Sequence, residues 1–155
     1  MIIRSLSRQE CTKLLESNRL GRLACADDGQ PYIVSIFYAY ADDHLYAFTL
    51  PGRKLDTMRA NPKVALLVEE FGQAREWRSV VAEGRFEELP DRIGHKRQRD
   101  HAWTLLSRHA EWGVPGALKP VTPPLSEYSP HVFFRIGIEH VSGREAKKVE
   151  EQGTA

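Results

Sequence analysis

The sequence predicts an α+β fold, in which short antiparallel strands form a barrel or sandwich flanked by a few helices. Alternating apolar and polar runs fill much of 21–50 and 77–89, and a β-branched run lies at 63–71. The 155 residues, 41% of them hydrophobic, suffice for one domain with a real core. We therefore expect a single domain over 1–146, followed by a disordered charged tail over 147–155.

A capping box marks the first helix. Ser7 is followed three residues later by Glu10, and in this pattern each side chain satisfies a backbone N–H group at the helix start. The helix is expected to run to about Ser17, with its apolar residues on one side: Cys11, Leu14 and Leu15.

Three strand-like runs occupy residues 21–50. The turn residues Asp27-Asp28-Gly29 separate the first two runs, and Asp42-Asp43 separate the last two. Turns of this kind join neighbouring antiparallel strands, so the segment predicts an antiparallel meander.

Beyond the meander, strand and helix patterns alternate. Helical spacing follows the turn at 51–54 and ends at Asn61-Pro62, because the residue before a proline disfavours the helical conformation. Strands are expected at 63–71 and 77–89, with Gly84 as a bulge or a point of close approach.

The last third of the chain predicts a helical segment, a loop and a strand. Helical spacing over 91–112 indicates one or two helices. The segment 113–131 is rich in proline, which predicts a long loop over the surface. The run at 132–146 predicts the final strand.

Composition argues against several partners. The net charge of +1 comes from 22 basic and 21 acidic residues spread along the chain, which does not favour nucleic acid. Cys11 and Cys25 are isolated thiols without metal-type spacing and favour a reducing compartment. Neither a signal peptide nor a membrane span is recognisable, so we expect a cytoplasmic protein with no membrane partner.

Familiar catalytic and metal motifs are missing from the sequence. It contains no G-x-S-x-G elbow, no G-x-x-x-x-G-K-[ST] loop and no G-x-G-x-x-G fingerprint. His95, His101 and His109 lie six and eight residues apart, which does not match a helical zinc pair. No metal ion is therefore predicted, and the catalytic residues stay unassigned.

The turn at Gly52-Arg53-Lys54 has two interpretations. Arginine and lysine in a surface turn are ordinarily solvated charges. However, a glycine turn that opens a helix presents unpaired backbone N–H groups, and two cations beside them would complete a phosphate site. Thr49, at the end of the preceding strand, would add a hydroxyl to the same anion.

The chain resembles the FMN-binding split-barrel proteins related to pyridoxamine 5'-phosphate oxidase, and within them the nitroimidazole-reductase-like branch. The likeness rests on segments that follow in the family's order and spacing: LLESNRLGRLAC, PYIVSIFYAY, LYAFTLPGRKLDTMRANPKVALLV, WRSVVAEGRFEEL and, more weakly, FFRIGIEHVSGRE. This resemblance implies a six-stranded antiparallel split barrel that dimerises and holds FMN in grooves between its two subunits.

The resemblance also implies which residues bind the cofactor. Arg53 and Lys54 match the family's phosphate-binding pair, and Ser79 matches a polar side chain near the flavin ring. The strand along the flavin and the strand end before the phosphate pair supply the remaining positions: Ile33, Val34, Ser35, Ile36, Phe48 and Thr49.

Two departures from the family pattern argue against oxidation of pyridoxamine phosphate. Ile33 and Tyr38 stand where the oxidase has basic side chains at the two ends of its flavin strand. Arg135 resembles an arginine that contacts the substrate phosphate, but Gly137 stands where a histidine is expected.

The resemblance therefore implies an FMN-dependent oxidoreductase that acts on a small conjugated or nitro-aromatic substrate, with a reduced nicotinamide or flavin as electron source. The alternative is a protein that binds or senses a flavin, a deazaflavin or heme on the same barrel without turnover. We expect a homodimer with C2 symmetry, in which apolar residues of the proline-rich loop cover the partner: Leu118, Leu125 and Tyr128.

Overall fold

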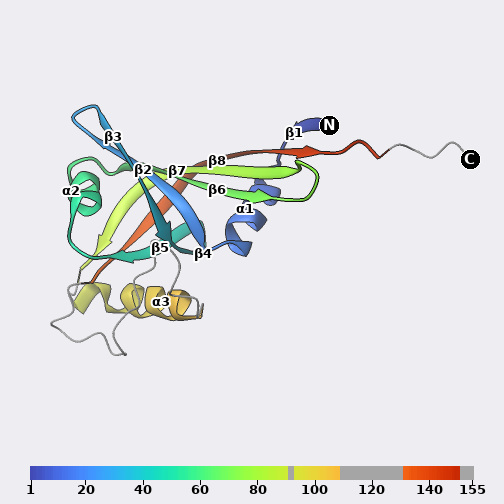
Figure 1. Cartoon of the computed structure of the whole chain (residues 1–155). Coiled ribbons are helices and arrows are strands. Elements are labelled where there is room, and N and C mark those ends of the chain that lie inside the picture. The colour runs from blue at the N-terminus through green and yellow to red at the C-terminus, as the bar shows by residue number, and fades with distance from the viewer. Residues whose placement is uncertain (91–92, 109–130, 151–155) are drawn as a thin grey trace, which may run out of the picture.

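The computed structural model of the chain describes residues 1–90, 93–108 and 131–150. Within them, a twisted antiparallel sheet is flanked by helices (Figure 1). The helices are α1 (Arg8–Ser17), α2 (Arg53–Ala60), the 3-10 helix η1 (Ile93–His95) and α3 (Lys96–Ser107). The strands are β1 (Ile2–Ser5), β2 (Leu20–Asp27), β3 (Gln30–Phe37), β4 (Ala39–Ala41), β5 (His44–Thr49), β6 (Lys63–Phe71), β7 (Trp77–Leu89) and β8 (Val132–Lys147).

The sheet confirms the α+β class. Its strands follow the order β3-β2-β6-β7-β8-β5-β4, and β1 pairs with the far end of β8. The described residues thus form eight strands rather than the six that the resemblance implies. The short strands β1 and β4, of four and three residues, account for the difference.

Both hairpins expected over residues 21–50 are confirmed, but the continuous meander is wrong because its middle strand breaks into β3 and β4. β2 and β3 pair across the turn at Asp28-Gly29, and β4 and β5 pair across Asp42-Asp43. However, β3 and β4 lie at opposite ends of the strand order, and the other side of β5 pairs with β8. Tyr38 lies at the break: its N–H donates to the Arg19 carbonyl and its hydroxyl donates to the Leu15 carbonyl of α1, both at 2.8 Å. Burial of this ring beside α1 redirects the chain, and no turn residue signals that change.

Helix α1 begins as the capping box predicts. The Ser7 hydroxyl accepts the Glu10 N–H at 3.2 Å, and the Glu10 carboxylate accepts the Ser7 N–H at 2.7 Å. The predicted apolar side of the helix is buried: Cys11, Leu14 and Leu15. Helix α2 ends at Ala60, directly before Asn61-Pro62, which confirms the helix end predicted there.

Two apolar clusters make up the core. The larger cluster joins α1 to the inner face of the sheet and includes Leu15, Leu23, Leu66, Val80 and Phe134. The smaller cluster lies where α3 covers β4 and β5 and includes Tyr46, Leu89, Ala102, Leu106 and Phe133 (Figure 1). The opposite, outer face of β3, β2 and β6 carries no helix in the described part of the chain.

Gly84 confirms both expectations placed on it. The register between β7 and β8 shifts between Glu83 and Gly84, which is a bulge. A Cβ atom at Gly84 would collide with the carbonyl oxygen of Gly137 on β8, so the two backbones approach closely here.

The helical prediction for 91–112 is confirmed where the chain is described, by η1 and α3. Residues 109–130, with most of the proline-rich loop, and 151–155 of the predicted tail lie outside the described residues. The first residue of that tail, Lys147, is the last residue of β8. Among the helices that are described, none has the length and apolar character needed to cross a membrane.

Candidate functional site

The turn between β5 and α2 leaves the start of the helix open. Gly52 is the N-cap residue and supplies no side-chain hydrogen bond. The first N–H groups of a helix have no partner within the helix, and the helix dipole places partial positive charge at this end. The local geometry is therefore suited to an anion.

Lys54 adds a poorly solvated charge at this open end. Its side chain is half-buried, and burial lowers the pKa of its ammonium below the ordinary value. Within the described residues the ammonium forms no ion pair and no hydrogen bond. A partly desolvated cation without a partner is unfavourable, so a bound anion would stabilise it.

Arg53 is the first residue of α2 and lies over the ring of Tyr32 on β3. Its guanidinium carbon is 4.4 Å from the ring centroid, a cation–π contact. Further along the helix region, the Asn61 side chain donates to the Ala26 carbonyl of β2 at 3.0 Å. These contacts hold α2 against the β2–β3 hairpin and fix the position of the basic pair.

Sequence reasoning missed Tyr32 and Cys25, which lie beside the basic pair. They are paired across β2 and β3, and the Cys25 thiol is buried. Burial raises the pKa of this thiol, and the nearby charges of Lys54 and Arg53 offset part of the rise. The tight turn at Asp28-Gly29 sets this pairing, so the sequence could have indicated that Tyr32 and Cys25 face each other. No feature of the sequence indicated that α2 docks on this hairpin.

Side chains of the predicted flavin strand, β3, point alternately to the two faces of the sheet. Ile33 is 67% exposed on the outer face, and Ser35 is partly exposed on the same face. Val34 and Ile36 point to the opposite face and pack into the larger core cluster. Only the first pair can present side chains to a ligand on the outer face, while Val34 and Ile36 can offer backbone groups there.

The strand end before the turn differs from its expected role. Thr49 is 2% exposed, and its hydroxyl donates to the Leu50 carbonyl at 2.9 Å. The expected hydroxyl contact to an anion is therefore already used. Phe48 packs beside the α3 cluster, with its ring 5.9 Å from Phe133 and 5.4 Å from His131.

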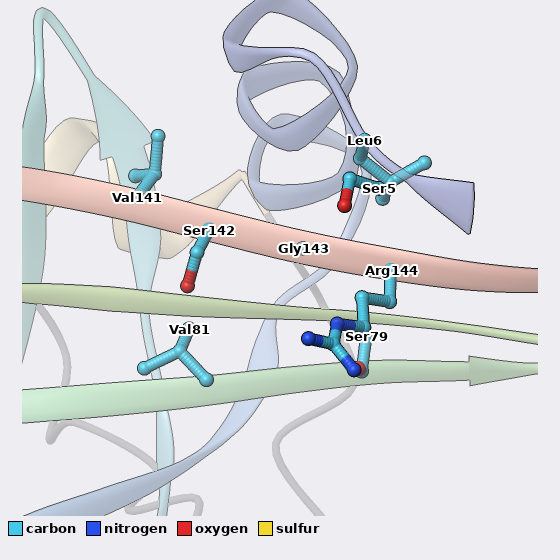
Figure 2. A pocket seen from close by; sticks show the side chains of 8 residues that line it. All are labelled: Ser5, Leu6, Ser79, Val81, Val141, Ser142, Gly143 and Arg144. Atoms are coloured by element: carbon cyan, nitrogen blue, oxygen red, sulfur yellow. The ribbon is translucent and has the colours of Figure 1, made fainter. Parts of the chain in front are cut away.

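Ser79 lies apart from the basic pair, at a different hollow. It lines a pocket of about 400 Å³ between β1, β7 and β8, shown in Figure 2. The described contacts do not connect Ser79 with Arg53 or Lys54. Within one chain, Ser79 therefore does not share a site with Arg53 and Lys54.

Arg135, which resembles a substrate-contacting arginine, is engaged within the chain. Its Nε donates to Glu87 at 2.7 Å across the β7–β8 pair. This hydrogen bond raises the pKa of the guanidinium and lowers the pKa of the Glu87 carboxyl. The arrangement is that of a cross-strand ion pair. Among the described residues, no group of three potential metal ligands occurs.

Comparison with known proteins places these features in a family context. The model of the family described as pyridoxamine 5'-phosphate oxidase matches residues 7–145. An uncharacterized protein of Rhizobium meliloti (strain 1021) is 47% identical over 146 residues, which cover 94% of this chain and 97% of that protein.

Solved structures resemble the whole fold. The crystal structure of a FAD-binding protein from Mesorhizobium loti is 61% identical, covers 95% of this chain and 100% of its own, and has a TM-score of 0.80. A candidate 5-nitroimidazole antibiotic resistance protein from Bacteroides thetaiotaomicron is 16% identical, with 94% of this chain and 89% of that chain covered and a TM-score of 0.72. The second likeness concerns the fold alone.

Proposed function

This chain belongs to the pyridoxamine 5'-phosphate oxidase family, and on that premise we propose that it is a flavin-dependent oxidoreductase for a small conjugated or nitro-aromatic substrate. The observation that carries the proposal is Lys54, a half-buried cation without a partner in the described chain, beside Arg53 at an uncapped helix start. The FAD-binding name of the relative from Mesorhizobium loti supports a flavin as the ligand.

The residues present fit a flavin phosphate. Lys54 and Arg53 would form charge-assisted hydrogen bonds to it, and the open end of α2 would add N–H donors. Tyr32 is the residue of β3 beside the basic pair, whereas Ile33 and Ser35 are exposed on the opposite face of that strand. When bound, a flavin supplies the electron-transfer chemistry, while the protein binds and orients it.

We propose FMN as the flavin. The two cations at the start of α2 match one terminal phosphate, and FMN ends in that group. FAD carries the same phosphate within a pyrophosphate, and it is the ligand named for the relative from Mesorhizobium loti. Heat release of the ligand followed by chromatography separates the two nucleotides.

A homodimer would complete the site. The outer face of β3, β2, β6 and β7 aligns Ser35, Arg22, Leu67 and Val81 in one row, next to the exposed Ile33. Pairing of two such faces about a twofold axis would cover Ile33, Leu67 and Val81. It would also allow the pocket at Ser79 of one subunit to meet the start of α2 of the other.

The test is an absorbance spectrum of concentrated protein, followed by anaerobic reduction with a reduced nicotinamide. Flavin bands that bleach on reduction and return with a nitro-aromatic acceptor support the oxidoreductase. A flavin that does not turn over, a deazaflavin spectrum or a heme Soret band favours the binding or sensing alternative. A colourless protein that takes up no added flavin contradicts the proposal.

A further inference from the structure

The pocket at Ser79 has a lining suited to an anion with an apolar body. It is formed by Ser5, Leu6, Ser79, Val81, Val141, Ser142, Gly143 and Arg144, and its volume of about 400 Å³ is that of a small-molecule site. The lining contains one cation, three hydroxyls and no carboxylate.

Strand pairing explains why the polar groups converge. Ser5, Arg144 and Ser79 are paired across β1, β8 and β7, so their side chains lie on the same side of the sheet. Ser142 and Val81 form the next pair on that side, two residues further along each strand. In Figure 2 the Arg144 side chain extends toward β7 and its partner Ser79.

Arg144 differs from its basic neighbours in having no carboxylate. Arg4, Arg78 and Lys147 all form ion pairs with Glu145, the buried carboxylate next along β8. Within the described residues, Arg144 forms neither an ion pair nor a hydrogen bond, and the three serine hydroxyls of the pocket form no hydrogen bond either. The donors of this pocket are therefore available to a ligand.

We propose that this pocket binds the carboxylate of a small aromatic or conjugated acid, and that the substrate of the oxidoreductase carries this group. A single guanidinium matches one carboxylate through its paired N–H donors, and the serines add further donors. Val81 lies on the same side as Arg144 and would contact the apolar body, whereas Leu6 and Val141 pack against the core on the opposite side. A phosphate is a poorer match, because the pocket lining has one cation whereas the start of α2 has two.

The substrate assignment rests on the proposed function, because Ser79 links the pocket to the flavin only through the family resemblance. Binding of the acid is a property of the pocket itself. The two claims are therefore separated by measuring acid binding and flavin content on the same samples.

The experiment titrates para-nitrobenzoate and the uncharged nitrobenzene into the protein as purified, by calorimetry at moderate salt. We expect Arg144→Gln to weaken para-nitrobenzoate binding by about tenfold to a hundredfold, the effect of losing one charge-assisted contact. Nitrobenzene binding should not change, and Arg144→Lys should restore part of the lost affinity. The matched control is Arg97→Gln, which alters an exposed arginine of α3.

Three outcomes overturn the inference: no binding of para-nitrobenzoate, equal affinity for the two probes, or an unchanged affinity in Arg144→Gln. Thermal unfolding of each variant checks that it is folded. If the protein binds the acid through Arg144 but never binds flavin, the pocket stands and the proposed function fails. If flavin binds and Arg144→Gln has no effect, the proposed function stands and this inference fails.

Discussion

The guanidinium of Arg53 lies over the ring of Tyr32, with 4.4 Å between the guanidinium carbon and the ring centroid. The contact joins the first residue of α2 to β3, so it orients one member of the basic pair from outside the helix. Tyr32 is therefore a positioning residue for the phosphate site, although it carries no charge itself.

Tyr32→Leu should raise the FMN dissociation constant by about twofold to fivefold, because a cation–π contact at an exposed site contributes roughly 0.5 to 1 kcal/mol. Riboflavin, which lacks the phosphate, should bind Tyr32→Leu as well as it binds the parent. Fluorescence titration measures both constants. Tyr32→Phe keeps the ring and should behave as the parent, and Tyr32→Leu should add nothing in an Arg53→Ala background.

Removal of the Lys54 charge tests the phosphate site more directly. Lys54→Met keeps an apolar stem and should weaken FMN binding by about tenfold to a hundredfold, with little effect on riboflavin. Lys13→Met, an exposed lysine of α1, is the matched control. If both Lys54→Met and Arg53→Ala bind FMN as tightly as the parent at moderate salt, the turn carries only solvated charges.

The local elements of this fold were predictable, because their signals lie within a few residues. The capping box at Ser7 and Glu10 satisfies backbone N–H groups at the start of α1. The turn at Asp28-Gly29 reverses the chain between β2 and β3. The turn at Asp42-Asp43 likewise predicted the pairing of β4 with β5. The pairing of β5 with β8 was not predictable, since it depends on Tyr38 burying its ring against α1. Docking of α2 on β3 is likewise a long-range contact, so the sequence indicated Arg53 and Lys54 but not Tyr32.

Gly84 provides a stability test of the bulge. Gly84→Ala would drive a Cβ into the Gly137 carbonyl, so we expect unfolding in urea to show a loss of about 1 to 3 kcal/mol, as for overpacked cores. Gly94→Ala is the control, because a Cβ there meets no atom within 4 Å. Equal stability of Gly84→Ala and the parent would mean that β7 and β8 separate without cost at this point.

Acid should loosen the N-terminal strand through two carboxylates that share Arg4. The hydrogen bond from Arg4 lowers the pKa of Glu10 to about 2. Burial acts to raise the pKa of Glu145, but the hydrogen bond from Arg4 and the surrounding basic charges bring it below its ordinary value.

Because both folded values are depressed, this contribution to stability is present above the ordinary glutamate pKa of about 4.3 and disappears as the pH falls through the folded values. Urea midpoints measured from about pH 5 to about pH 2 should therefore fall, and they should fall less in Glu145→Gln than in the parent. An identical slope in the two proteins would contradict this assignment.

Ile33 tests the assembly. Its side chain is 67% exposed on the outer face of β3, so it would become buried if two such faces paired. Ile33→Glu would place a carboxylate in that interface, and burial of an unpaired charge is costly. Sedimentation should therefore show a dimer for the parent and a monomer for the variant at micromolar concentration.

Because the proposed flavin site lies between subunits, the monomeric variant should also lose its flavin. Val149→Glu, at another exposed β-branched residue, should stay dimeric and keep its flavin. A parent protein that sediments as a monomer with flavin bound would show that one subunit is enough to bind flavin. The pocket at Ser79 would then not lie beside the flavin.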